Sequence, residues 1–338
     1  MRLLITGGAG FIGSNFARYW SLEHPADAIV VLDLLTYAGV RASLADLEDR
    51  GAVKFVQGDI GDQQLVESIL AADRIDTIVN FAAESHNSYA VVDPGRFFRT
   101  NVLGTQVLCE AAKRQGVRRL HHISTCEVFG DLALDSDEAF VEGSLYRPRT
   151  PYNASKAAAD HVVRSYGETF GLPATITNCC NNYGPYQFPE KVVPLFTTRA
   201  IKGEPLHLYA ATANRREWLH VDDHCRAIEA VLEAGQVGET YLVGSGVEAS
   251  IEEIADLVLA ATGGSHDLKT IVADRPGHDR RYLLDSTKIR RQLGWSPQVD
   301  FDEGMARTVS WYEQNRSWWE PLIGRSPVAE DSWARASS

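Results

Sequence analysis

The sequence RLLITGGAGFIG at residues 2–13 decides the fold of this chain. A short apolar strand, expected at residues 3–6, runs into glycines at positions 7, 10 and 13, and a helix is expected at residues 13–21. Glycines at this spacing between a strand and a helix let the backbone approach a pyrophosphate, which the helix N-terminus then holds. The stretch therefore predicts the first turn of a dinucleotide-binding fold.

The rest of the first half alternates short apolar strands with longer segments of helical periodicity. Short buried strands joined by helix-length connections imply crossovers and a parallel sheet. The pattern predicts a doubly wound α/β (Rossmann) fold, whose ligands bind at the carboxyl ends of the strands. The expected strands are 3–6, 29–32, 54–57, 77–81, 120–124 and 174–178, and the expected helices are 13–21, 63–71, 100–115 and 151–170.

The alternation weakens after residue 178, where turn-rich stretches and short helices follow one another. We therefore expect a dinucleotide-binding domain at residues 1–178, with late strands returning to its sheet around residues 219–245. Residues 179–325 are expected to form mainly a smaller, interleaved lobe that binds the substrate. Residues 326–338 are polar and are expected to form a loose tail.

Composition and charge exclude several classes of function. The 338 residues carry a formal net charge of −12, which argues against a nucleic-acid partner, because such binding relies on basic residues that neutralise phosphates. No stretch approaches the roughly 20 apolar residues of a membrane span. The five cysteines lack the C-x-x-C spacing of zinc or redox sites. We therefore expect a reduced, cytoplasmic protein without a metal site.

A carboxylate further along the chain identifies the expected dinucleotide. Asp33 ends the second expected strand, where a carboxylate accepts hydrogen bonds from the adenosine ribose and repels a 2′-phosphate. This position predicts NAD rather than NADP. Asp59 follows the third strand, where it either reads the adenine amino group or caps a local turn. The expected cofactor contacts are Gly7, Gly10, Phe11, Ile12, Gly13, Asp33, Asp59, Ile60, Ala82, Asn101, Tyr152 and Lys156.

The candidate catalytic groups lie in two short segments. Tyr152 and Lys156 are one helical turn apart, so both side chains project from one face. A nearby ammonium favours the phenolate, and we expect it to lower the tyrosine pKa from its usual value of about 10. Such a tyrosine takes a proton from an alcohol while a hydride leaves the same carbon. The segment Ser124-Thr125-Cys126-Glu127 adds hydroxyls, a thiol and a carboxylate at the end of a strand.

With these motifs the chain resembles the extended short-chain dehydrogenase/reductases, and among them the dTDP-glucose 4,6-dehydratases. The resemblance covers nearly the whole chain, including TGGAGFIGSN, STCEVFGDL, PYNASKAAADH and REWLHVDDHCRAI. It implies that Thr125, Tyr152 and Lys156 act at sugar C4 and that Glu127 lies near C5. It also implies a dTDP- or UDP-linked sugar as substrate and a homodimer. The expected substrate contacts are Ser85, His86, Asn87, Tyr89, Asn181, Asn182, Glu190, Lys191, Arg216, Arg275, His278 and Tyr282.

Two departures from the family pattern bear on the reaction. The dehydratases have Thr-Asp-Glu, with an aspartate that protonates the departing C6 hydroxyl, where this chain has Cys126. They also have His-Val-Asp-Arg-Ser where this chain has His86-Asn87-Ser88-Tyr89-Ala90. A neutral thiol would not repel a C6 carboxylate, as an aspartate would. Asn87 and Tyr89 could supply hydrogen-bonding groups to that carboxylate.

The leading prediction is therefore decarboxylation of a UDP- or dTDP-glucuronate, through oxidation at C4, to a 4-keto-pentose or pentose. Dehydration of dTDP-glucose across C4 to C6 remains an alternative, because a protonated thiol can donate a proton or Cys126 can simply fill space. Elimination of water across C5 and C6 is a further alternative. A non-catalytic NAD-binding sensor is the rival of another class, and the intact Thr125, Glu127, Tyr152 and Lys156 argue against it.

Overall fold

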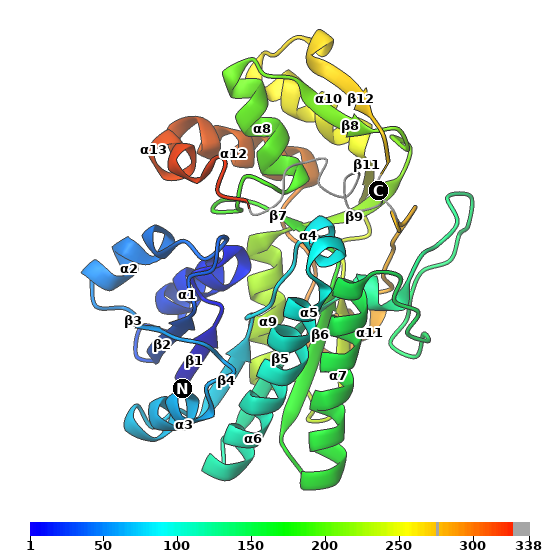
Figure 1. Cartoon of the computed structure of the whole chain (residues 1–338). Helices are drawn as coiled ribbons and strands as arrows, with labels where there is room; N and C mark the ends of the chain where they lie inside the picture. Colours follow the sequence, from blue (N-terminus) through cyan, green and yellow to red (C-terminus); the bar gives the residue numbers. More distant parts are fainter. Residues whose placement is uncertain (275–276, 327–338) are drawn as a thin grey trace.

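The computed structural model describes residues 1–274 and 277–326 (Figure 1). Two parts of the sequence predictions lie outside the described residues: Arg275, an expected substrate contact, and residues 327–338 of the expected tail. The described chain forms a large layered unit, drawn in the lower part of Figure 1, and a smaller lobe above it.

Seven parallel strands form the central sheet, in the order β10-β6-β5-β4-β1-β2-β3. The order reverses between β1 and β4, since β2 and β3 continue on one side and β5 and β6 on the other. Ligands of open α/β sheets bind at such a switch point. The predicted doubly wound fold is thus confirmed. The strands are β1 (Arg2–Thr6), β2 (Ala28–Asp33), β3 (Lys54–Gln57), β4 (Thr77–Asn80), β5 (Arg119–Thr125), β6 (Ala174–Cys179) and β10 (Thr240–Val243).

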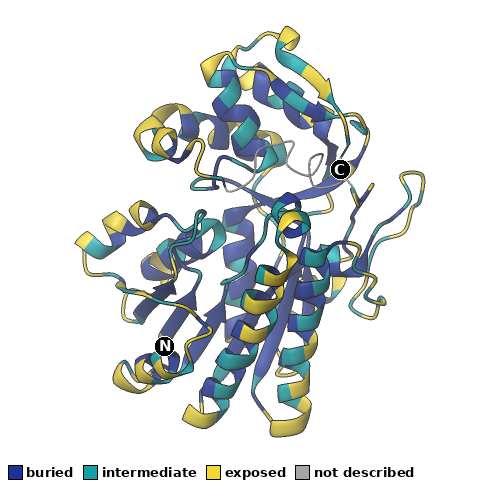
Figure 2. Cartoon of the chain, viewed as in Figure 1, coloured by how far each residue is buried: buried dark blue, intermediate teal, exposed yellow. Residues whose placement is uncertain are grey.

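Helices cover both faces of the sheet (Figure 1). On one face, α1 (Phe11–Glu23) and α9 (Val221–Ala234) pack together, and Trp20 of α1 and Ile228 of α9 belong to the same buried cluster. On the other face lie α3 (Gln63–Ala72), α6 (Thr105–Gln115) and α7 (Pro151–Phe170). Figure 2 shows buried strands between helices whose outer faces are exposed. Within the described residues, no helix is long and apolar enough to cross a membrane.

The helix α7 carries Tyr152 and Lys156, and its bounds follow from its end signals. The Thr150 side chain caps the N-terminus by accepting a hydrogen bond from the Asn153 amide. Pro151 occupies the first helical position, where its missing N–H is not needed. Gly171 ends the helix in the left-handed conformation, with φ of 68°. The predicted helix at residues 151–170 is confirmed.

The connecting elements of the large unit are short. The expected helix at residues 100–115 begins as a π-helix and continues as α6. Two short helices, α4 and α5, lie over the N-terminal end of α7 (Figure 1). These elements are η1 (Arg41–Leu44), α2 (Ala45–Asp49), α4 (Asn87–Val92), α5 (Pro94–Phe97), the π-helix η2 (Phe98–Gly104) and η3 (Cys126–Phe129).

The smaller lobe contains two small sheets, with the orders β11-β9-β7 and β12-β8. The expected strand near Leu219 is β9, which pairs with β7 and β11 and not with the central sheet. That part of the prediction is wrong, because β9 serves two cores: Trp218 packs inside the lobe, while Leu219 packs in the cluster that includes Val243. The strand β10 does join the central sheet, beside β6. The domain boundary at residue 178 stays a prediction.

The remaining elements belong to this lobe or join it to the sheet. They are β7 (Asn181–Tyr183), α8 (Val192–Lys202), β8 (Leu206–Tyr209), β9 (Arg215–His220), β11 (Glu248–Ser250), α10 (Ile251–Thr262), η4 (His266–Leu268), β12 (Lys269–Val272), α11 (Thr287–Leu293), α12 (Phe301–Gln314), α13 (Arg316–Trp319) and η5 (Glu320–Leu322).

Candidate active site

A cleft of about 1810 Å³ lies between the carboxyl ends of the central strands and the smaller lobe. Residues at the ends of β1, β2, β4, β5 and β6 line its floor, and residues of α8 and β8 line its upper part. The cleft therefore occupies the switch point of the sheet, where the fold predicts the ligand site.

The glycine-rich turn forms one wall of the cleft. Its backbone lies so close to neighbouring backbone atoms that a side chain would not fit at Gly7 or Gly13. Gly7 has a φ of 66°, and a Cβ there would lie 2.6 Å from the amide nitrogen of Ala82. A Cβ at Gly13 would lie 2.4 Å from the carbonyl oxygen of Gly7. Gly10 precedes α1 and has no side chain to cap its first amides. The turn thus leaves room and backbone donors for a pyrophosphate.

Asp33 is fixed at the end of β2, where it lines the cleft. Its Oδ2 accepts a hydrogen bond from the Ala9 amide at 2.9 Å, and its Oδ1 accepts one from the Leu35 amide at 2.8 Å. Burial raises the pKa of Asp33, and the two amide bonds oppose that rise. The carboxylate is held beside the glycine turn, as ribose recognition requires. The residues present therefore fit NAD.

The other expected cofactor contacts divide into two groups. Phe11, Ile12, Asp59, Ile60 and Ala82 all line the cleft. Asp59 also accepts a hydrogen bond from the Gly61 amide at 2.8 Å, so the local cap is present as well. Asn101 is buried behind the wall, where it bonds the main chain of Glu84 and the hydroxyl of Ser155. Because its amide is used by these bonds, Asn101 holds the loop after β4 against α7.

The expected C4 machinery converges on the floor of the cleft. Thr125 ends β5, Glu127 lies in η3, and Tyr152 and Lys156 project from α7; all four line the cleft. The Lys156 ammonium donates a hydrogen bond to the carbonyl oxygen of Ile123 at 2.7 Å and lies 3.3 Å from His122 Nε2. Sequence positions that are far apart thus supply a hydroxyl, a carboxylate, a phenol and an ammonium to one place.

The pKa of Tyr152 differs from the sequence-based expectation. Burial raises it well above its usual value, the Glu127 carboxylate raises it further, and a hydrogen bond with the Thr125 side chain opposes the rise. The lowering by Lys156 that the sequence predicted is therefore not found, and the only lowering contribution comes from Thr125. Burial also lowers the pKa of Lys156 to about 8, although the Asp160 carboxylate opposes that change.

The sequence analysis did not single out Asp160, a completely buried carboxylate four residues after Lys156. Its Oδ2 accepts hydrogen bonds from Ser124 Oγ at 3.0 Å, Tyr146 OH at 2.7 Å and Asn178 Nδ2 at 3.2 Å. Its Oδ1 lies 3.5 Å from His122 Nε2. His122 Nε2 therefore lies close to both the Asp160 carboxylate and the Lys156 ammonium. The helical spacing from Lys156 was the available signal, because residues i and i+4 share a face.

Cys126 does not line the cleft, although both of its neighbours do. Its side chain is completely buried in a cluster that includes Phe129, Cys179 and Cys180. Burial raises the pKa of the thiol well above its usual value, and the charge of Glu127 adds to the rise. The structure thus places a neutral thiol behind the wall. The expected contact with the substrate at C6 is not seen in this arrangement.

The segment after β4 approaches Glu127. Ser85, His86 and Asn87 line the cleft, whereas Tyr89 does not. Arg96, a residue that the sequence analysis did not single out, lines the cleft and pairs with the buried Glu84 at 2.7 Å. Its guanidinium also lies 3.3 Å from the Tyr89 hydroxyl. An arginine from α5 is therefore present near the segment in which the family's arginine is missing.

The upper part of the cleft carries the expected nucleotide contacts. Arg216 is buried, lies over the ring of Tyr282 at 4.7 Å, and donates hydrogen bonds to carbonyl oxygens of residues 215, 279 and 280. Lys191 Nζ bonds the carbonyl oxygen of Ser85 at 2.9 Å. Glu190 accepts a hydrogen bond from the Tyr37 hydroxyl at 2.8 Å. The expected contacts that line this region are Asn181, Asn182, Glu190, Lys191, Arg216, His278 and Tyr282.

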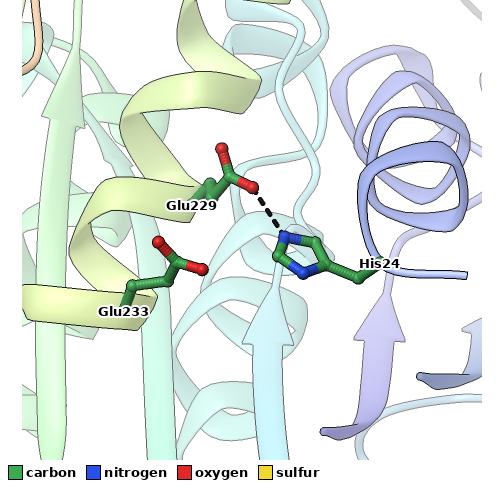
Figure 3. A group of neighbouring side chains, drawn as sticks. All are labelled: His24, Glu229 and Glu233. Carbon is green, nitrogen blue, oxygen red and sulfur yellow. Dashed lines mark hydrogen bonds and ion pairs between the residues drawn. The ribbon is translucent and has the colours of Figure 1, made fainter. Parts of the chain in front are cut away.

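A second group of titratable side chains lies outside the cleft lining (Figure 3). His24 Nε2 and Glu229 Oε1 are 2.6 Å apart, and Glu233 lies one helical turn after Glu229. The other oxygen of Glu229 accepts a hydrogen bond from the Tyr19 hydroxyl. These contacts tie the end of α1 to α9 across one face of the molecule.

Comparison with known proteins gives the family of the chain. The family model described as GDP-mannose 4,6 dehydratase matches residues 4–308. A dTDP-glucose 4,6-dehydratase of Mycobacterium tuberculosis is 49% identical over 95% of this chain and 96% of its own length. The solved structure of DesIV, a dTDP-glucose 4,6-dehydratase from Streptomyces venezuelae with NAD bound, is 49% identical, with a TM-score of 0.91 over 95% of this chain and 100% of that one.

A more distant structure has the same fold. A UDP-glucose 4-epimerase from Thermotoga maritima is 28% identical and has a TM-score of 0.87 over 94% of this chain and 100% of its own. The glycine-rich turn, the Tyr152 and Lys156 pair and these similarities agree. The chain belongs to the extended short-chain dehydrogenase/reductases, in the family of nucleotide-sugar enzymes that resemble dTDP-glucose 4,6-dehydratase.

Proposed function

We propose that the chain is an NAD-dependent dehydratase that converts dTDP-glucose to the 4-keto-6-deoxy sugar. One observation carries this proposal: Thr125, Glu127, Tyr152 and Lys156 line the same cleft as the glycine-rich turn and Asp33. Support also comes from the 49% identity to dTDP-glucose 4,6-dehydratases over 95% of the chain.

The cleft divides between cofactor and substrate. Gly7, Gly10 and Asp33 hold the adenosine and pyrophosphate of NAD, while Arg216 and Lys191 hold the nucleoside diphosphate of the sugar. Arginine suits this role because its planar fork offers several donors to phosphate oxygens. Its donors must then exchange the carbonyl oxygens they now bond for phosphate oxygens.

The reaction requires two proton transfers to protein side chains. Tyr152, bonded to Thr125, accepts the proton of the C4 hydroxyl, and Lys156 supplies a positive charge beside it. The NAD that Gly7, Gly10 and Asp33 would hold would supply the acceptor of the C4 hydride and the donor of a hydride to C6, so the sugar would undergo no net oxidation. Glu127 removes the C5 proton and later returns one to that carbon. The C6 hydroxyl leaves as water with the proton that Glu127 took from C5. Tyr152 releases the C4 proton to solvent, and solvent returns one proton to Glu127 for delivery to C5, so a single water is the only net loss.

The decarboxylation that we predicted from Cys126 is not supported by the relatives, which carry the dehydratase name. The structure also weakens its premise. The argument required a neutral group facing C6, whereas the Cys126 thiol is buried among Phe129, Cys179 and Cys180. The proton for the departing hydroxyl then comes from a group in the cleft. Glu127, the residue next to Cys126, supplies a carboxyl group that lines the cleft.

Incubation with NAD and each of three substrates, followed by mass analysis, tests the proposal. We expect dTDP-glucose to lose one water. UDP-glucose, which differs in its nucleoside, tests whether the enzyme selects the base of the nucleotide. Loss of carbon dioxide from dTDP-glucuronate, with dTDP-glucose unchanged, would restore the decarboxylase. NAD binding without turnover of any substrate would favour the sensor. The homodimer and the cytoplasmic location stay predictions, and light scattering in solution measures the first.

A further inference from the structure

We propose that Asn87 is a positioning residue that orients the Glu127 carboxylate for its work at C5, and does not bind substrate. The proposal rests on the proposed function, in which Glu127 exchanges a proton with that carbon. It concerns the first residue of α4, which lies over the N-terminal end of α7 (Figure 1).

Both ends of the Asn87 amide are already bonded to protein groups. Its Nδ2 donates a hydrogen bond to Glu127 Oε2 at 3.0 Å. Its Oδ1 accepts one from the Thr150 hydroxyl at 2.9 Å. The side chain therefore joins three elements: α4, η3 and the cap of α7. We had expected Asn87 to contact a carboxylate of the substrate, and these bonds instead direct it to a carboxylate of the protein.

The direction of the hydrogen bonds is fixed by Glu127, because an ionised carboxylate only accepts and must therefore face the NH₂ group of Asn87. The buried Thr150 hydroxyl, which accepts a hydrogen bond from the Asn153 amide, then donates its own proton to Asn87 Oδ1. A flipped amide would set one acceptor against another at Glu127. The network therefore has one consistent arrangement.

This arrangement couples the two groups that act on the sugar. The helix cap that bonds Asn87 belongs to α7, two residues before Tyr152. One oxygen of Glu127 is held by a group fixed to that same helix end. A carboxylate with several rotatable bonds is thereby kept in one orientation relative to the phenol, as proton transfer at adjacent carbons requires.

The experiment separates the step at C4 from the step at C5. With dTDP-glucose in D₂O, the absorbance of reduced nicotinamide reports oxidation at C4, and deuterium entry at C5 reports Glu127. We expect Asn87→Leu, which keeps the size but loses both bonds, to slow deuterium entry about tenfold or more. Oxidation at C4 should stay within about twofold, so reduced nicotinamide accumulates. Val92→Ala, at an exposed position of the same helix, is the matched control.

Asn87→Asp adds a pH readout that a structural role would not move. Its ionised carboxylate repels Glu127, whereas its protonated form can again donate to Glu127 and accept from Thr150. Deuterium entry in this variant should recover as the pH falls, relative to wild type, and Asn87→Leu should show no such recovery. The titratable groups whose charges act on Glu127 are Cys126, Tyr152, Cys179 and Tyr282. His86, beside Asn87 in the chain, faces Glu190. All of these groups are unchanged in both variants.

Two outcomes would overturn the proposal: an Asn87→Leu variant with normal deuterium entry, or one that loses both steps equally while its thermal midpoint equals that of wild type. A measurement without substrate tests the contact between Asn87 and Glu127 even if the proposed function is wrong. In enzyme with ¹³C-labelled glutamate carboxyl groups, the Glu127 signal, assigned with Glu127→Gln, should titrate at higher pH in Asn87→Leu, because a donor to its ionised form is lost. An unchanged titration would refute the contact even if dTDP-glucose is not the substrate.

Discussion

Replacing Asp160 with asparagine should shift the pH dependence of oxidation at C4. The ammonium of Lys156 lies 3.3 Å from His122 Nε2, and that nitrogen lies 3.5 Å from Asp160 Oδ1, so the two charges are within about 7 Å. At an effective dielectric constant of about 20, their attraction is about 2.4 kcal/mol, which corresponds to roughly 1.7 pH units.

The sign follows from the charge that is removed. Lys156 has a pKa of about 8, lowered by burial and raised by Asp160. The ammonium is present below that pH and is lost as the pH rises through it. In Asp160→Asn the opposing carboxylate is gone, so the pKa of Lys156 falls further. The alkaline limb of the pH–rate profile should therefore move to lower pH by about 1.7 units.

The assay is single-turnover formation of reduced nicotinamide between pH 5 and 10, at a temperature well below the thermal midpoint of each variant. Tyr146→Phe is the matched control: it removes one of the three donors to Asp160 Oδ2 but leaves the carboxylate in place. Its alkaline limb should stay near that of wild type. An Asp160→Asn profile with an unmoved alkaline limb, or one moved to higher pH, would refute this reasoning.

Three further substitutions test separate parts of the site. Tyr152→Phe should abolish turnover and leave the affinity for NAD within about twofold by calorimetry, because it removes the proton acceptor but little binding surface; near-normal activity would exclude Tyr152 as the base. Asp33→Ala should weaken the binding of NAD about tenfold and reduce the preference for NAD over NADP. If the variant binds NAD and NADP as tightly as wild type does, the carboxylate that recognises the ribose lies elsewhere. Cys126→Asp should lower the thermal midpoint by at least about 5 °C, because it buries a carboxylate beside Glu127. Cys126→Ser should keep most of the activity. A stable Asp variant with faster turnover of dTDP-glucose would show that the position faces the substrate.

Local sequence signals predicted the large unit well. The helix at residues 151–170 is bounded by Thr150, Pro151 and Gly171, whose effects act over a few residues, and the structure ends it at the same positions. The strand pattern predicted the parallel sheet for the same reason, since buried parallel strands are apolar throughout. In contrast, the strands with which β9 pairs depend on the cores in which Trp218 and Leu219 are buried, and the local sequence does not indicate those cores.

The sequence predicted which residues form the candidate site, but not all of the contacts between them. Spacing on one helix brought Tyr152 and Lys156 together, the end of a strand indicated Thr125 and Glu127, and the family resemblance added the roles of these residues at C4 and C5. The direction of the Cys126 side chain depends on where η3 turns after β5, which the sequence leaves open. The bond between Asn87 and Glu127 joins residues 40 positions apart, so only the tertiary fold reveals it.

The return of the hydride within one active site is the central claim, and isotope transfer tests it most directly. The substrate is dTDP-glucose with deuterium at C4, incubated with the enzyme and NAD in ordinary water. We predict a product that has lost one water and carries the deuterium at C6, with no net formation of reduced nicotinamide. A product that retains deuterium at C4, or reduced nicotinamide that accumulates in proportion to product, would contradict the account.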